Sequence, residues 1–183
     1  MVRSCKEISV VTKRIIAVTV LFALFAVPLI AQNADKAEKE LTTNEKKSIL
    51  REFTHTANMD GINYTFILLN DKSVDALFVG DSKISMRTRA NMSTCFFVSG
   101  KATRDLTAYK PTFSVEQEGK SIAGEAINIQ NFAPGTVSRG AKVQGLIQLA
   151  EKIDLTKPFR IRGPQNASTD MKLSKKALEY LEN

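Results

Sequence analysis

From Gly61 onward, short apolar runs alternate with clusters of turn residues. Runs of this length with one polar face are typical of antiparallel strands, which bury one face and expose the other. The intervening segments are mostly too short for crossover helices, which disfavours a parallel sheet. The pattern predicts about eight strands, over residues 62–69, 74–79, 83–89, 93–98, 113–118, 120–129, 143–150 and 158–162.

The turn spacing favours a mainly β fold, an antiparallel sandwich of about 7–8 strands with a short C-terminal helix. Residues 113–118 and 120–129 should pair across Gly119 as a hairpin. Asp170 is the expected N-cap of the helix, because its carboxylate can accept from free backbone amides. One face of that helix repeats Leu173, Ala177, Tyr180 and Leu181. We expect a core of Tyr64, Phe66, Leu68, Phe78, Ile84, Met86, Cys95, Phe97, Phe113, Val115, Ile127, Ile129, Val143, Ile147, Leu149, Phe159 and Ile161.

The N-terminus has the features of a secretory signal peptide. Basic residues precede an apolar run from Ile15 to Ala31, and the composition turns polar at Gln32. The pattern predicts a signal peptide over residues 1–31 and a secreted, periplasmic or cell-envelope location. An uncleaved N-terminal anchor is the alternative, since a spanning helix needs about 20 apolar residues and this run is at the lower edge of the usable range.

Residues 32–57 are rich in lysine and glutamate and poor in apolar side chains. This composition is typical of a solvated spacer, here with some helical tendency. The folded domain is therefore expected over residues 58–183.

Near the C-terminus, Pro134-Gly135 precedes an apolar run from Gly145 to Leu149, and a further segment runs from Lys157 to Ile161. These segments resemble the last strand pair of secreted immunoglobulin-like sandwich domains. The resemblance implies a sandwich fold in a class of domains that bind, adhere or act as spacers. It implies no catalytic residue, and the paired cysteines and central tryptophan of antibody domains are absent from this sequence.

The whole chain has a net charge of +7, but much of the excess lies in residues 1–31. Those residues hold four basic side chains and one acid, so the 26 basic and 19 acidic residues fall to 22 and 18, a net charge of +4. A charge this small is poor evidence for nucleic-acid binding, and no nucleic-acid partner is expected.

Few residues suit catalysis. Beyond residue 31, Cys95 is the only cysteine and His55 the only histidine, which excludes a zinc site built from several such ligands. The apolar surroundings of Cys95 favour a buried residue over a reactive thiol. No Gly-x-Ser-x-Gly elbow or phosphate-binding loop is present, so neither a cofactor nor a metal is expected.

Carboxylate chemistry is the enzymatic alternative. Glu116 and Glu118 share one face of a predicted strand, and Glu125 lies on the next strand. Paired acids can hydrolyse glycosides or bind calcium. A small secreted hydrolase using these residues therefore remains open.

The remaining candidate is a basic surface. Lys83, Arg87 and Arg89 should project from one strand, and Arg160 and Arg162 from another. If the two strands are neighbours, their five cations form one outer face that suits an acidic polymer, a lipid headgroup or an acidic protein partner at the cell envelope.

The sequence thus favours an exported, non-enzymatic binding, adhesion or envelope-accessory module. A structural envelope protein is the other alternative, with membrane contact only through an uncleaved N-terminal segment.

Overall fold

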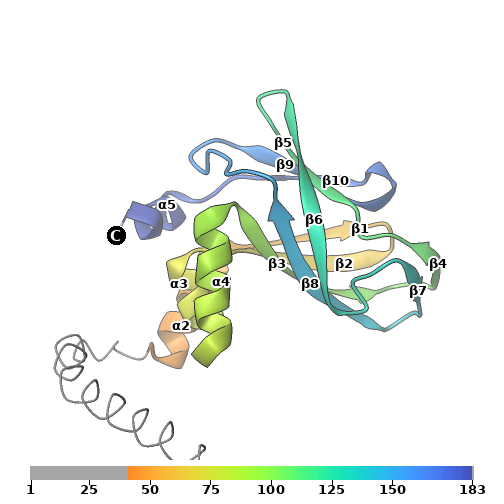
Figure 1. Ribbon diagram of the computed structural model, residues 1–183, viewed down its shortest axis with the longest axis horizontal. Helices are drawn as coiled ribbons and strands as arrows, with labels where there is room; N and C mark the ends of the chain where they lie inside the picture. The colour runs from red at the N-terminus through yellow and green to blue at the C-terminus, as the bar shows by residue number, and fades with distance from the viewer. Residues whose placement is uncertain (1–40, 183) are drawn as a thin grey trace, which may run out of the picture. The chain divides into compact units, whose positions relative to one another are not determined.

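The computed structural model describes residues 41–182 (Figure 1). The helices of this part are α2 (Thr43–Phe53), α3 (Asp71–Leu77), α4 (Gly80–Met92), the 3-10 helix η1 (Pro164–Asn166) and α5 (Lys175–Glu182). The strands are β1 (Thr54–Met59), β2 (Ile62–Leu68), β3 (Cys95–Ala102), β4 (Leu106–Tyr109), β5 (Phe113–Gln117), β6 (Lys120–Gln130), β7 (Gly135–Val137), β8 (Lys142–Leu149), β9 (Phe159–Arg162) and β10 (Ser168–Met171).

Eight of the strands form one antiparallel sheet in the order β1-β2-β3-β8-β6-β5-β9-β10. The sheet curls until its end strands approach each other, and His55 Nε2 lies 2.7 Å from Thr169 Oγ1 across the gap between β1 and β10. Strands β4 and β7 form a separate pair. The fold is therefore mainly antiparallel β with a C-terminal helix, as predicted. The immunoglobulin-like sandwich is not confirmed, because one nearly closed sheet takes the place of two packed sheets.

Six of the predicted strands are present, as β2, β3, β5, β6, β8 and β9. The expected hairpin is β5–β6, with Gln117 opposite Lys120. Its two turn residues, Glu118 and Gly119, have φ angles of 51° and 80°. Two positive φ angles are the mark of a type I′ turn, whose twist matches that of the flanking strands.

The predicted strands at 74–79 and 83–89 are wrong, because these residues belong mainly to α3 and α4. The Asn70 side chain accepts from the Ser73 backbone N–H, and the Ser73 hydroxyl accepts from the Asn70 N–H. This capping box starts a helix where the sequence suggested a turn. The alternation over 83–89 is too short to decide between a strand and a helix.

Over residues 41–57 the expected helical tendency of the predicted spacer is present as α2, but the segment is packed into the domain rather than solvated. Thr42 and Glu45 form a capping box that starts α2, and Ile49 and Phe53 of this helix are buried. Strand β1 follows directly, so Leu41 onward belongs to one compact unit and the boundary at residue 58 is not found. Residues 32–40 and the predicted signal peptide over 1–31 lie outside the described residues. Among residues 41–182, no helix has the length and apolar content needed to cross a membrane.

The C-terminal helix starts later than expected. Asp170 lies in β10 rather than at an N-cap, and the Ser174 hydroxyl accepts from the Ala177 backbone N–H just before α5. The ring of Tyr180 on α5 lies 6.3 Å from the ring of Phe53 on α2. The two helices therefore pack against each other.

Buried side chains form two clusters. The larger lies inside the curled sheet and includes Tyr64, Phe66, Phe113 and Ile161. The smaller consists of Leu69, Val74, Cys95 and Leu146, with residues of α3 and α4 packed against it. Most predicted core positions are buried, but Phe78, Met86, Phe97 and Ile127 are half-buried. Ile84 and Ile129 are exposed to 67% and 52%. Ile84 is exposed because it lies on the outer face of a helix.

Candidate functional site

A cleft of about 740 Å³ lies beside α3 and α4. Side chains from α3, α4, the β8–β9 loop and α5 line it, although these elements are far apart in the sequence. Its lining is more polar than apolar, and its apolar side chains include Leu155, Tyr180 and Leu181, with Leu69 and Ile153 mostly buried behind them. The cleft therefore has room for a small organic molecule that combines a polar group with a short apolar part.

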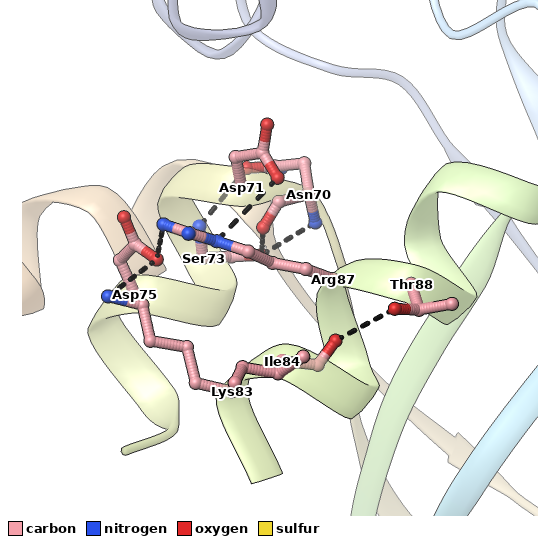
Figure 2. A network of polar contacts seen from close by, with 8 residues as sticks. All are labelled: Asn70, Asp71, Ser73, Asp75, Lys83, Ile84, Arg87 and Thr88. Carbon is pink, nitrogen blue, oxygen red and sulfur yellow. Dashed lines mark hydrogen bonds and ion pairs between the residues drawn. The ribbon is translucent and has the colours of Figure 1, made fainter. Parts of the chain in front are cut away.

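An ion-pair network joins α4 to α3 at one wall of this cleft (Figure 2). Arg87 Nη2 lies 2.5 Å from Asp75 Oδ1, and Lys83 Nζ lies 3.3 Å from the same oxygen. Arg87 Nε is 3.9 Å from Asp71 Oδ1. The Asp75 side chain is 19% exposed, so this network is partly shielded from water. Ion pairs in such surroundings are less screened by salt than fully exposed ones.

The charges that line the cleft are unevenly matched. Asp71 and Asp75 already have basic partners on α4. Lys72 and Lys152 also line the cleft, and neither forms an ion pair with any residue of the described part of the chain. The cleft thus combines two unpaired ammonium groups with apolar side chains, and it has no lining acid that lacks a basic partner.

The predicted basic surface is not formed as expected. Lys83, Arg87 and Arg89 lie on helix α4. Arg160 and Arg162 lie on β9, and in the sheet the strands β5 and β6 lie between β9 and β8. Arg89 Nη1 donates to Gln148 Oε1 at 2.7 Å. Arg160 Nε lies 2.7 Å from Asp170 Oδ1, and Arg162 pairs with Glu116. The five cations therefore serve separate local contacts, and of the five only Arg87 lines the cleft.

Of the three candidate acids, Glu116 and Glu118 line one pocket, but Glu125 is not brought to it. Glu116 pairs with Arg162, and Lys157 Nζ lies 2.8 Å from Glu118 Oε1. Glu125 is opposite Gln148 on β8. Ser121, opposite Glu116, is four residues from Glu125, or roughly 13 Å along the strand. Glu125 thus lines a different pocket from the other two acids.

Cys95 and His55 also lie away from the cleft lining. Cys95 is fully buried, and burial raises the pKa of its thiol to about 11, which keeps it protonated at neutral pH. His55 lies in β1 rather than in a spacer, and burial lowers its pKa. Among residues 41–182, no group of three or more His, Cys, Asp or Glu side chains is placed to hold a metal ion.

The pKa of His55 leads to a pH-dependent stability. Because the folded chain binds the proton of this ring more weakly than the unfolded chain, the free energy of unfolding should fall as the pH drops below about 6.5. Above that pH the stabilising contribution of the neutral His55 ring is fully present. It is lost as the pH falls through the lower pKa that this ring has in the folded chain. Urea unfolding at several pH values should show this decline in the native protein and a smaller decline in His55→Gln. Equal slopes in both proteins would exclude His55 as the cause.

Sequence reasoning identified Arg87 but not the cleft. The spacing of Asn70 and Ser73 was an available signal, because it fits a capping box and places Asp71 and Asp75 on a helix. No comparable signal marked Lys72 and Lys152, which are 80 positions apart and meet one cleft only through the fold.

Comparisons with known proteins add little. No family model and no curated protein matches the chain. A functionally unknown protein from Listeria monocytogenes aligns with a TM-score of 0.37 and 14% identity, over 74% of this chain and 95% of that one. A DUF4426 family protein from Pseudomonas aeruginosa aligns with a TM-score of 0.31 and 11% identity, over 66% and 90% of the two chains. These TM-scores are too low to indicate a shared function.

Proposed function

We propose that this protein is an exported, non-enzymatic binding module whose cleft holds a small ligand with one anionic group and an apolar body. The observation that carries the proposal is the pair of unpaired lysines, Lys72 and Lys152, over a cleft whose acids already have basic partners. An anion placed there gains two favourable charge interactions and displaces no existing ion pair.

The apolar side chains define the rest of the ligand. Leu155 and Leu181 offer aliphatic surface, and the ring of Tyr180 adds an aromatic one. Burying a short hydrocarbon chain against such surface is favourable by about 25 cal/mol per Å². The two lysines favour an anionic group at one end of the ligand, and the apolar side chains favour a hydrocarbon body.

A binding module also fits the state of the reactive groups. Cys95 is buried with a raised pKa, His55 contacts Thr169 at the edge of the sheet, and Glu116 and Glu118 are ion-paired. None of these residues lines the cleft. Export is inferred from the predicted signal peptide, and a mature protein that begins near residue 32 would support it. Retention of the leader would favour the tethered alternative.

Octanoate is a suitable probe, because it has one carboxylate and a short hydrocarbon chain. We expect it to bind in titration calorimetry, whereas acetate and octylamine, which lack the chain or the negative charge, should bind more weakly. Replacing Lys72 and Lys152 together with glutamine should weaken octanoate binding about tenfold, as expected for the loss of two charge interactions near the protein surface.

The matched control replaces Lys101 and Lys142 with glutamine. These lysines are opposite each other on β3 and β8, are exposed and do not line the cleft. The same net charge is then removed elsewhere, and octanoate affinity should be unchanged. Equal weakening in both double variants would show that only the overall charge matters, and the cleft would be rejected as the site.

A further inference from the structure

Two rows of polar side chains cross the outer face of the sheet, over strands that are neighbours in Figure 1. Residues opposite each other on paired strands share a face. The register thus forms a first row, here called the lysine row, from Asn58, Asn63, Lys101 and Lys142. A second row, the amide row, consists of Thr56, Thr65, Ser99, Gln144 and Gln130. Tyr64 and Val98 alternate with these residues along β2 and β3 and are buried, so both rows face away from the core.

Both rows are open to solvent. All four residues of the lysine row are exposed, and the amide row is exposed at its two ends and half-buried between them. The next row of the same face is apolar and includes Phe97, Leu146 and Ile127, against which residues of α3 and α4 pack. The helices therefore cover one part of this outer face and leave the polar part accessible.

The charge of this face is not compensated within the described chain. Lys101 and Lys142 are directly opposite each other, and neither forms an ion pair with any of residues 41–182. Neither row contains an acid. On the other half of the sheet, by contrast, Arg160 pairs with Asp170 and Arg162 pairs with Glu116. Like charges directly opposite on paired strands are destabilising, so an anion bound between the two lysines would remove an unfavourable contact.

The neutral groups beside the lysines narrow the class of anion. No side chain of the amide row forms a hydrogen bond with another residue of the described part of the chain. Amide and hydroxyl groups both donate and accept, as the hydroxyls of a sugar do. Neither row holds an aromatic or large apolar residue, whereas protein interfaces are enriched in aromatic residues and membrane-binding faces insert apolar ones. The face therefore suits an acidic polysaccharide better than an acidic protein or an anionic membrane.

We propose that the lysine row and the amide row together bind an acidic polysaccharide. A carboxylate of the polymer lies between Lys101 and Lys142, and its hydroxyls bond to the amide row. The amide row crosses five strands, or roughly 19 Å, so one polymer chain can contact both rows at once. None of the nine residues lines the cleft, so this surface is a second site and does not depend on the proposed function.

Polygalacturonate is the probe, because it is a polymer of uronic acid with free hydroxyl groups. It should bind the native protein in titration calorimetry, and replacing Lys101 and Lys142 together with glutamine should weaken the binding about tenfold. Both lysines are exposed, so the thermal melt of this variant should match that of the native protein. The matched control is the double variant of Lys72 and Lys152 in the cleft, which loses the same charge and should bind polygalacturonate unchanged. Equal weakening in both variants, or no binding to the native protein, overturns the proposal.

Three other probes test the class of partner. Dextran has hydroxyls without charge and should not bind, polyglutamate has carboxylates without hydroxyls and should bind more weakly than polygalacturonate, and anionic phosphatidylglycerol vesicles should bind more weakly as well. Polyglutamate binding as tightly as polygalacturonate would point to an acidic protein instead. Vesicles that bind as tightly would point to a membrane, and either result rejects the polysaccharide.

Replacing Gln144 and Gln130 together with alanine tests the amide row without changing the charge. Polygalacturonate binding should weaken about fivefold, as expected for the loss of two hydrogen bonds at the surface, whereas polyglutamate binding should not change. An unchanged affinity for polygalacturonate would exclude the amide row from the site. Octanoate binding in the cleft is measured separately, so failure of this site leaves the proposed function intact.

Discussion

Replacing Phe66 with alanine should lower the free energy of unfolding by about 3–5 kcal/mol, a typical cost for removing a buried aromatic ring. Phe66 has no solvent exposure, and its ring centroid lies 5.6 Å from that of Tyr64 and 6.1 Å from that of Phe113. Because small domains are stable by only about 5–15 kcal/mol, this one change removes much of the total. Urea unfolding followed by far-ultraviolet circular dichroism measures the loss.

The control for Phe66 is Ile129→Ala. Ile129 is also a large apolar residue of the sheet, but 52% of its surface is exposed. Its replacement should change the free energy of unfolding by no more than about 0.5 kcal/mol. Similar losses in the two variants would mean that the inside of the curled sheet is not the main core.

Gly145→Ala should have the second largest effect, a loss of about 1–3 kcal/mol from overpacking. A Cβ at this position of β8 would lie 2.2 Å from Phe132 Cδ1 and 2.5 Å from the backbone oxygen of Ile127. The Phe132 ring is buried and stacks on Phe113 at 5.7 Å, so it has little freedom to move. The clash with a backbone oxygen requires the neighbouring strand to shift as well.

Ser121→Thr is the matched control for Gly145→Ala, because it also adds one methyl group to a strand of the same sheet. Ser121 is exposed on β6, so the added methyl group meets water and the stability should hardly change. A thermal melt in which both variants behave like the native protein would show that the sheet adapts at Gly145.

The strands that sequence could identify are those with a strong apolar face. In β2, the inward residues Tyr64, Phe66 and Leu68 alternate with less buried ones over most of the strand, and the period of two is clear. Strand β1 (Thr54–Met59) lacks this signal, because Met59 is its only buried residue. It is nevertheless a strand, since all six of its residues pair with β2. Tertiary pairing here overrides a composition that resembles a spacer.

The sequence pattern failed to predict the helices α3 and α4 for a different reason. Val74 and Leu77 of α3 are apolar at a spacing that either structure permits, and the run is short. The deciding feature is the capping box of Asn70 and Ser73, a pair of side-chain contacts that apolar periodicity does not contain. Helix α4 has no side-chain cap at its N-terminus, so no such contact marked it, and Lys83, Arg87 and Arg89 were placed on a sheet face instead of on this helix.

The cleft could not be predicted from the sequence, because the topology of the fold brings its lining residues together. Lys72 follows β2, Lys152 follows β8, and Tyr180 belongs to the last helix. Their meeting depends on the order of strands in the sheet, where β3 lies between β2 and β8. Spacing along the chain carries no information about that order.

The near meeting of β1 and β10 has a consequence for the protein in concentrated solution. The end strand of an open sheet offers unpaired N–H and C=O groups to other molecules, and this is a common route to aggregation. Here each end strand has the other beside it, with His55 and Thr169 in contact, and β10 also presents the charged pair of Asp170 with Arg160. A strand from another molecule finds neither edge fully open. We therefore expect the domain to stay dispersed without a disulfide to clamp its ends, since Cys95 is the only cysteine among residues 41–182 and is buried.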